Sequence, residues 1–337
     1  MNKLKIGLIG TGHLGKIHAK LLKEIKSCEF IGIYDQDLER AKTVGDEFKV
    51  NVFNEIEKLY EVTDAVDIVA TTSAHYKLVN ESFERNKHVF VEKPITAHIW
   101  EAEELVKLAE NKKLVFQVGH IERFNPALVS LEKYNLDPLF IQTDLLAQFN
   151  PRGTDVAVVL DLMIHDIDII LSLIKSDVKT VSASGVPVVS DSIDIANARL
   201  EFENGAVANV TASRISQKKM RKMRMFQRDA YISLDFTTGI AEVFRLVPPD
   251  QKPKGLFKSF GEIGIGEKKK IVAFEQPKFK EINALKHELE LFVESIEKNE
   301  TPIVSGKDGL KALRVAEMII SKIEESIELA KIFPSKQ

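Results

Sequence analysis

The chain has 337 residues, 44% hydrophobic and 29% charged, which is the balance of a soluble globular protein and a length that suits two domains. A formal net charge of −3 gives no electrostatic footprint for a nucleic acid or an anionic membrane, so neither is expected as a partner. Cys28 is the only cysteine, which excludes an intrachain disulfide and fits a reducing, cytoplasmic setting. No uncharged stretch is long enough to span a bilayer, and the N-terminus runs directly into a predicted strand.

The first part of the chain alternates short apolar runs with amphipathic helical segments. Strands alternating with helices are typical of βαβ units, whose crossovers produce a doubly wound parallel sheet. The sequence therefore predicts an α/β, Rossmann-type domain over residues 1–122. Strands are predicted at residues 4–9, 30–34, 66–70, 89–91 and 114–118, and helices at 16–25, 38–48, 76–86 and 99–111.

After Pro126 the pattern changes to one helical segment followed by strands of period 2. Asn204 and Gly205 lie between two of these strands and predict a type I′ hairpin turn. Consecutive hairpins indicate an open, mainly antiparallel sheet backed by helices, an α+β domain over residues 123–337. The helix is predicted at 155–174, the strands at 180–189, 195–203, 206–213 and 231–236, a mobile excursion at 248–270, and a closing amphipathic helix at about 307–327 that can pack back on the first domain.

A glycine-rich segment connects the first predicted strand to the first predicted helix. GxGxxG alone is a weak signal, but a strand before it and a helix after it are the context that a dinucleotide-binding loop requires. Gly10 permits the tight turn, Gly12 lets the backbone approach a pyrophosphate, and Gly15 allows close packing of helix on sheet. A glycine turn without a ligand is the alternative. The predicted cofactor-binding residues here are Gly10, Thr11, Gly12, His13, Leu14 and Gly15.

Asp35 ends the second predicted strand, twenty residues after Gly15. An acidic residue at this point accepts hydrogen bonds from the adenine ribose. No arginine precedes Arg40, and Asp37 adds a second carboxylate, so a 2′-phosphate would meet repulsion with little compensation. We therefore predict NAD as the cofactor, in preference to NADP. The alternative is an aspartate that only forms the turn after the strand.

Glu92-Lys93-Pro94 follows the fourth predicted strand. Pro94 keeps Lys93 extended, so the ammonium projects from the carboxyl edge of the sheet, where ligands bind in such folds. A solvated lysine beside a chain-reversing proline is the alternative.

The segment 161–168, DLMIHDID, carries the second set of chemical groups. On a helix, Asp161, His165 and Asp168 share one face, and Asp161 can orient an imidazole that accepts a proton from an alcohol. Histidine titrates near neutrality, as this role requires. The alternatives are a solvated helix face and a zinc site, but the cysteine-poor chain offers no strong third ligand pattern and no metal is expected.

Taken together, these residues resemble the glucose–fructose oxidoreductase / inositol dehydrogenase / MocA family. The matching segments are GTGHLG at 10–15, the segment around His75, KHVFVEKP at 87–94 and DLMIHDID at 161–168. The resemblance implies a Rossmann domain, a large open sheet through which members often form dimers or tetramers, and catalytic Lys93, Asp161 and His165 converging on the substrate carbon. It also implies cofactor contacts from Thr71, Thr72, His75, Glu92 and Lys93. Met163 stands where the family commonly has glycine, and Thr72-Ser73 replaces a frequent proline.

Two further segments are similar to the subgroup of UDP-N-acetylglucosamine 3-dehydrogenases, namely VGHIERFNPA at 118–127 and SRISQKKMRKMRMF at 213–226. This similarity implies a small-molecule substrate, a UDP-N-acetylhexosamine oxidised at C3, contacted by Arg123 and Asn125 besides the catalytic residues. The alternatives are an inositol or free-sugar dehydrogenase, a reductase of a non-sugar substrate, and a non-catalytic NAD-responsive regulator. The cations available for the diphosphate, or for a merely solvated strand edge, are Lys218, Lys219, Arg221, Lys222 and Arg224.

The strands of the second domain are also rich in alanine. Small side chains permit close packing against another layer, and an antiparallel sheet can leave one face for a partner. A homo-oligomer built on this sheet is therefore predicted, the alternative being that the small residues face the domain's own helices. The residues are Ala196, Ala198, Ala206, Ala208 and Ala212.

Overall fold

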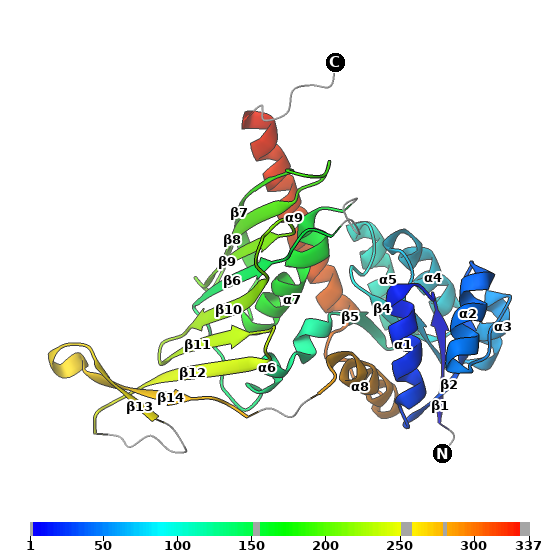
Figure 1. Ribbon diagram of the computed structural model, residues 1–337, viewed down its shortest axis with the longest axis horizontal. Helices are drawn as coiled ribbons and strands as arrows, with labels where there is room; N and C mark the ends of the chain where they lie inside the picture. The colour runs from blue at the N-terminus through cyan, green and yellow to red at the C-terminus, as the bar shows by residue number, and fades with distance from the viewer. Residues whose placement is uncertain (1–2, 151–155, 251–257, 279–281, 331–337) are drawn as a thin grey trace. The chain divides into compact units, whose positions relative to one another are not determined.

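The computed structural model describes residues 3–150, 156–250, 258–278 and 282–330 (Figure 1). The chain divides into two compact units, Met1–Phe124 with Ile282–Leu313 and Asn125–Glu281 with Arg314–Gln337. The first unit thus takes in a C-terminal segment that the sequence-based division, 1–122 and 123–337, assigned to the second. The reason is α8 (Ala284–Lys298), which packs against α1 (His13–Glu24) and against the 3-10 turn η1 (Ile121–Phe124).

The first unit contains a five-stranded parallel sheet in the order β2-β1-β3-β4-β5. Successive strands leave β1 first to one side and then to the other, so the connections reverse at β1 and β3, the place where ligands bind in open α/β sheets. This is the predicted Rossmann fold. Its elements besides α1 are β1 (Leu4–Ile9), β2 (Cys28–Tyr34), α2 (Leu38–Phe48), α3 (Ile56–Val62), β3 (Ala65–Ile68), α4 (Thr72–Glu84), β4 (His88–Glu92), α5 (Ile99–Lys112) and β5 (Phe116–Gly119).

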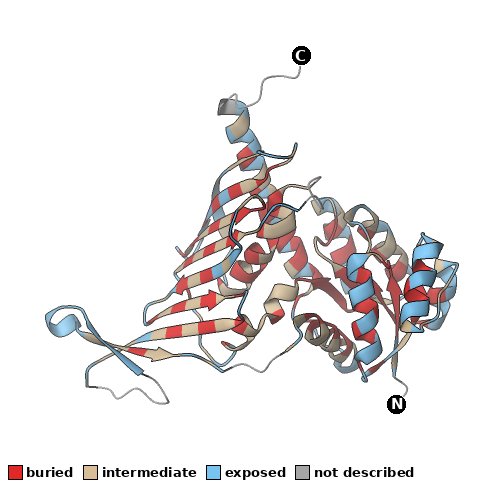
Figure 2. Ribbon diagram, viewed as in Figure 1, coloured by how far each residue is buried: buried red, intermediate tan, exposed pale blue. Residues whose placement is uncertain are grey.

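Figure 2 shows that most of the strand residues in this sheet are buried, and the buried side chains are mainly apolar. Leu8 of β1 and Phe90 of β4 are fully buried, and Phe292 of α8 packs edge-on against Phe90 with ring centroids 5.8 Å apart. Burial of such side chains on both faces explains why the strands read as continuous hydrophobic runs. β3 departs from this pattern, because it contains a fully buried ionisable residue, Asp67.

The second unit is built on a nine-stranded sheet in the order β13-β14-β12-β11-β10-β6-β9-β8-β7. β6 and β9 pair in parallel and the other neighbours are antiparallel, so the predicted open, mainly antiparallel sheet is confirmed. The elements are α6 (Pro126–Val129), β6 (Phe140–Leu146), a π-helical turn η2 (Val159–Met163), α7 (Ile164–Leu173), β7 (Val178–Val186), β8 (Ile195–Phe202), β9 (Val207–Ser213), β10 (Met220–Phe226), β11 (Ala230–Asp235), β12 (Ile240–Val247), β13 (Lys258–Ile263), η3 (Gly266–Lys268), β14 (Lys270–Glu275) and α9 (Gly306–Ala330), which runs from the first unit into the second.

Two local predictions need correction. Within the predicted mobile excursion at 248–270, residues 258–263 form β13, which pairs with β14 at 270–275. Residues 251–257 lie outside the described residues. The turn between β8 and β9 is not type I′, because Gly205 has a positive φ (84°) and Asn204 does not. Asn204 instead accepts a hydrogen bond from the Ala206 amide through its side-chain oxygen.

The nine-stranded sheet has one face covered by helices and one open face. In β8 and β9 the buried side chains alternate with exposed or half-buried ones, and the buried face meets α7 and η2. The prediction that the alanines of these strands face a partner subunit is therefore wrong, because their small side chains pack inside the unit itself. At most 1% of each is exposed in Ala196, Ala198, Ala206, Ala208 and Ala212.

Candidate functional site

A cavity of about 640 Å³ lies in the first unit where the strand order reverses. It is bounded by the carboxyl ends of β1, β2 and β4 and by the starts of α1 and α4, as expected for a dinucleotide site. Among the residues described, no three His, Cys, Asp or Glu side chains are grouped so that they could hold a metal ion. The predicted cofactor-binding residues that line the cavity are Gly10, Gly12, His13, Leu14, Asp35, Thr71, Glu92 and Lys93.

The glycine loop has the backbone geometry that a diphosphate requires. Gly10 has a φ of 100°, and a Cβ on it would lie 2.3 Å from the Val69 carbonyl oxygen. A Cβ on Gly15 would lie 2.1 Å from the Gly10 carbonyl oxygen, so helix and strand touch there. A Cβ on Gly12 would meet nothing within 4 Å and would project into the open cavity. Since α1 begins at His13 without a side-chain cap, its first N–H groups remain available to an anion, and the residues fit a bound dinucleotide.

Asp35 is buried at the end of β2 and accepts several hydrogen bonds. The backbone N–H and the hydroxyl of Thr11 donate to its Oδ2 at 2.7 and 2.9 Å. Arg40 donates from Nη2 to Oδ1 at 2.7 Å and from Nε to Oδ2 at 3.3 Å. Burial alone would raise the pKa of Asp35, but these donors, Arg40 first, hold that pKa below its ordinary value. The carboxylate is therefore ionised and fixed.

Arg40 also lines the cavity, which corrects part of the argument about cofactor choice. From the sequence, no basic residue was expected close enough to compensate a 2′-phosphate. The helical start of α2 instead brings the guanidinium of Arg40 directly onto Asp35. Cofactor preference then depends on this ion pair, because the arginine is held by the carboxylate.

Four of the predicted cofactor contacts do not line the cavity, namely Thr11, Gly15, Thr72 and His75. Thr11 acts on Asp35, as described above. The imidazole of His75 is buried, with Nδ1 2.9 Å from the Pro94 carbonyl oxygen and Nε2 3.2 Å from that of Ala70. Burial lowers the pKa of His75, and its ring lies between the end of β3 and the turn that follows Lys93.

In the second unit, Asp161 lies in the π-helical turn η2 and His165 in the first turn of α7. Both side chains are half-buried, whereas Asp168 is buried with 1% of its surface exposed, so it does not share their environment. Short π-helical segments within helices are frequent at functional sites. The regular helix predicted over 155–174 therefore starts with an irregular turn that carries a candidate catalytic residue, and its first residue, 155, lies outside the described part of the chain.

A buried ion pair fixes the chain just before η2. Asp194 Oδ1 lies 3.3 Å from Arg214 Nε, and Asp194 Oδ2 accepts hydrogen bonds from the amides of Val188, Val189 and Ser190. Burial opposes ionisation of Asp194, but these donors lower its pKa to about 2. Arg214 donates to the Val156 carbonyl oxygen and, at 2.9 Å, to that of Ile193. This pair, which the sequence did not reveal, anchors the entry to the turn that holds Asp161.

Arg123 and Asn125 lie on either side of the division between the units. Arg123 is half-buried in η1, in the first unit. The side-chain oxygen of Asn125 accepts from the Ala127 amide and so caps α6, while its amide donates to the Phe236 carbonyl oxygen at 3.1 Å. These contacts give Asn125 a structural role in the second unit.

The predicted cationic run is divided between the two faces of the sheet. Lys222 and Arg224 point to the open face, where their nitrogens lie 3.6 Å from Asp235 and 3.7 Å from Asp144. Arg221 alternates with them and is half-buried on the helix-covered face, its guanidinium 5.4 Å from the centre of the Phe236 ring. Lys218 and Lys219 are exposed before β10. Of the strand residues in this run, Arg221 alone shares a face with α7.

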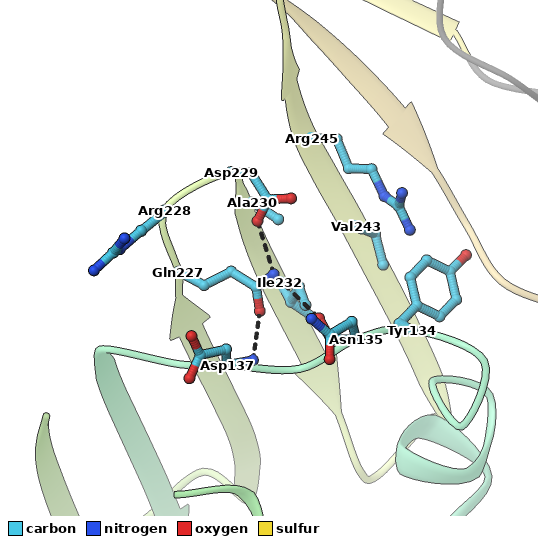
Figure 3. Close-up of a pocket in the computed structure, with 10 residues that line it drawn as sticks. All are labelled: Tyr134, Asn135, Asp137, Gln227, Arg228, Asp229, Ala230, Ile232, Val243 and Arg245. Carbon is cyan, nitrogen blue, oxygen red and sulfur yellow. Dashed lines mark hydrogen bonds between the residues drawn. The ribbon is translucent and has the colours of Figure 1, made fainter. Parts of the chain in front are cut away.

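The second unit also has a smaller cavity of about 230 Å³, at the turn between β10 and β11 (Figure 3). Gln227 occupies its centre: its amide donates to the Asn135 carbonyl oxygen and to Asp229, and its side-chain oxygen accepts from the Asp137 amide. Arg245 lies over the ring of Tyr134. None of the predicted site residues lines this cavity, and its polar groups serve to hold the loop 134–137 against the sheet.

Comparisons with known proteins agree with this geometry. The model for the oxidoreductase family with an NAD-binding Rossmann fold matches residues 4–120, and the model for the GFO/IDH/MocA C-terminal domain matches residues 144–240. UDP-N-acetylglucosamine 3-dehydrogenase of Acidithiobacillus ferrooxidans is 36% identical over 245 residues, 72% of this chain and 78% of that protein. A solved structure of that enzyme superposes with a TM-score of 0.86 at 32% identity, over 96% of this chain and 99% of the other. scyllo-Inositol 2-dehydrogenase (NAD+) of Bacillus subtilis is 28% identical, over 64% of this chain and 68% of that protein.

The Rossmann sheet, the glycine cradle and the buried Asp35 define an NAD-binding oxidoreductase. With both family models matched, the chain belongs to the glucose–fructose oxidoreductase / inositol dehydrogenase / MocA family, and the predicted family and the predicted cofactor NAD are confirmed. Within the described residues, no helix has the length and apolar character needed to cross a membrane.

Proposed function

We propose that the protein is a cytoplasmic NAD-dependent dehydrogenase that oxidises the C3 hydroxyl of a UDP-N-acetylhexosamine to a ketone. The observation that carries this proposal is the 36% identity to a UDP-N-acetylglucosamine 3-dehydrogenase, together with the presence of Lys93, Asp161 and His165 in this chain. A non-catalytic NAD-responsive regulator would need none of these three side chains. The cytoplasmic location rests on the single buried Cys28.

In this proposal the imidazole of His165 takes the proton of the reacting hydroxyl, and the carboxylate of Asp161 keeps the imidazole oriented. The ammonium of Lys93, which lines the cofactor cavity, hydrogen-bonds the reacting oxygen and stabilises the alkoxide character of the transition state. When bound, NAD supplies the acceptor for the hydride that leaves carbon. The proton and the hydride together account for the two hydrogens lost when the alcohol becomes a ketone.

Arg221 is our candidate for the diphosphate. It lies on the helix-covered face of the sheet, on the same side as α7, and an arginine can form paired, charge-assisted hydrogen bonds with phosphate. Lys222 lies next to it in the chain but points to the open face beside Asp235. The two residues therefore form a matched pair for a binding test.

UDP-N-acetylglucosamine should raise the melting temperature of the protein in the presence of NAD, because a ligand that binds the folded state stabilises it by mass action. Arg221→Ala should reduce this shift and raise the KM about 10- to 100-fold, since hydrogen bonds to charged groups contribute roughly 1.5–3 kcal/mol, while Lys222→Ala should leave both near the wild-type values. The proposal is wrong if UDP-sugars neither protect the protein nor support NADH formation, and a free polyol does both.

The second candidate is an inositol or free-sugar dehydrogenase. It is favoured by the match to scyllo-inositol 2-dehydrogenase and by a 23% identity to myo-inositol 2-dehydrogenase of Thermotoga maritima, which extends over 98% of this chain and 99% of that protein. A neutral polyol needs no cation for a diphosphate, so activity with inositol that is insensitive to Arg221→Ala would favour this candidate.

We also propose a homo-oligomer that forms through the open face of the nine-stranded sheet. Six aromatic rings cross this face from strand to strand, with neighbouring centroids 4.9 to 5.9 Å apart. Phe226 and Phe260 are exposed and the other four are half-buried, and aromatic rows on an accessible face are typical of protein interfaces. Light scattering at micromolar concentration should give a dimer or tetramer, and a monomer would contradict the proposal. The rings are Phe140, Phe226, Tyr231, Phe244, Phe260 and Phe274.

A further inference from the structure

Three ionisable side chains meet in the interior of the first unit, beneath the cofactor cavity. His18 comes from α1, Asp67 from β3 and Glu92 from the end of β4. His18 and Asp67 are fully buried, and 12% of the Glu92 side chain is exposed. Burial of ionisable groups costs free energy unless they pair with one another, so an apolar side chain would fill these positions of the sheet and helix at a lower cost.

The geometry places one carboxylate at each nitrogen of the imidazole. His18 Nδ1 lies 2.8 Å from Asp67 Oδ2, and Nε2 lies 3.2 Å from Glu92 Oε1. The contact of Nδ1 with Asp67 is a hydrogen bond, whereas Nε2 and Glu92 meet as an ion pair without hydrogen-bond geometry. A protonated His18 thus places a positive charge between the two carboxylates. Burial alone would lower the pKa of His18, but Asp67 and Glu92 outweigh it and raise that pKa to about 10.

Glu92 is held as the anion at the cavity end of this array. Burial opposes its ionisation, yet the contact with His18, with help from Lys93, keeps the pKa of Glu92 below its ordinary value. For Asp67 burial prevails and raises the pKa. The neighbouring strand makes room for the Glu92 carboxylate at Gly119, where a Cβ would lie 2.8 Å from Glu92 Oε1. The Lys93 amide completes the site by donating to Glu92 Oε2 at 3.2 Å.

Glu92, Lys93 and Asp35 all line the cavity. Glu92 ends β4, Lys93 follows it and Asp35 follows β2, and these two strands lie on opposite sides of β1 and β3 in the sheet. Because Asp35 fits the adenine ribose and the glycine loop fits the diphosphate, Glu92 and Lys93 border the nicotinamide half. The oxidised nicotinamide ring carries a positive charge and the reduced ring does not. An ammonium alone at this end would repel the oxidised ring, and an adjacent carboxylate cancels that repulsion.

We propose that His18 and Asp67 are positioning residues that hold Glu92 as a carboxylate at the nicotinamide end of the cavity, and that they thereby favour the binding of NAD+ over NADH. A protein distinguishes two ligands only if its interaction free energies with them differ. Here the difference arises because the nicotinamide ring is charged in NAD+ and neutral in NADH. The proposal concerns the cofactor and does not depend on which sugar is oxidised.

The test is the ratio of the dissociation constants of NADH and NAD+, measured by titration calorimetry on the purified full-length protein. Glu92→Gln retains the shape of the side chain, and His18→Gln removes the cation that holds Glu92 ionised. Glu92→Gln should lower the ratio about tenfold, the effect of a unit charge at roughly 10 Å in an effective dielectric constant of 20. His18→Gln should lower the ratio by a smaller factor, because Lys93 still favours the Glu92 carboxylate. Tyr60→Phe is the control, because it removes a buried hydroxyl that contacts Ser82 in the same unit without changing charge.

In the control the ratio should remain at the wild-type value. If both dissociation constants change by the same factor in Glu92→Gln, the array has only a structural role and the proposal fails. His18→Gln leaves two buried carboxylates facing each other and can fail to fold, in which case Glu92→Gln decides the question alone.

Discussion

Asp35→Ala should weaken the binding of NAD about 10- to 100-fold, because hydrogen bonds from the ribose to a charged acceptor contribute roughly 1.5–3 kcal/mol. The same change should strengthen the binding of NADP. In the wild type, the guanidinium of Arg40 is held by the Asp35 carboxylate at 2.7 Å, and an added 2′-phosphate would be repelled by that carboxylate. Without Asp35, Arg40 can pair with the phosphate. Dissociation constants for NAD and NADP measure both effects.

Two further variants separate the contributions to this preference. Asp35→Ala/Arg40→Ala should lose the gain in NADP binding, since no cation remains at the ribose. Asp37→Ala tests the second carboxylate, because Asp37 caps α2 and lies 3.5 Å from Arg40 but does not accept from Thr11. It should lower stability by about 1 kcal/mol, as loss of an N-cap does, and strengthen the binding of NADP less than Asp35→Ala does. Equal or tighter binding of NADP by the wild type would overturn the assignment.

The sequence was most informative where local periodicity and long-range packing agree. The strands of the first unit are apolar on both faces, and α2 begins and ends at the predicted residues 38 and 48. The second unit was harder to predict. β6 lies in the middle of the sheet between β10 and β9, yet it is followed in the chain by helical residues, so no hairpin marks it. α8 was missed as a part of the first unit because its packing against α1 joins residues far apart in the chain.

The candidate site could be predicted only as far as single motifs extend. Gly10, Gly12 and Asp35 have spacings fixed by one βαβ unit, and all three line the cavity. The Asp35–Arg40 pair depends on the first turn of α2, and the Asp194–Arg214 pair joins the residue before β8 to the residue after β9, so no spacing rule reveals them. His18 was hidden for another reason. Its position on α1 fits an apolar helix face, and the carboxylates that charge it come from β3 and β4.

His165→Ala should lower kcat by roughly 10²–10⁴-fold, the usual loss when an acid–base group is removed. The binding of NAD should persist, because the cofactor cavity is lined by residues of the first unit and His165 belongs to the second. Asp161→Asn should lower kcat less and leave KM near the wild-type value, since a neutral amide can orient an imidazole but does not stabilise its protonated form. Steady-state kinetics measure kcat and KM, and cofactor titration measures the dissociation constant of NAD.

The matched control for this experiment is His98→Ala. His98 is exposed at the start of α5 and is not among the residues that line the cofactor cavity, so its loss should leave kcat unchanged.

The pH profile of the rate adds a second criterion. A histidine that accepts the hydroxyl proton must be neutral to act, so the rate should fall as the pH decreases through the range where histidine is protonated. In His165→Gln this acidic limb should disappear along with most of the activity. A His165→Ala enzyme with near-normal turnover would exclude the assigned role, whereas loss of NAD binding in that variant would indicate a folding defect.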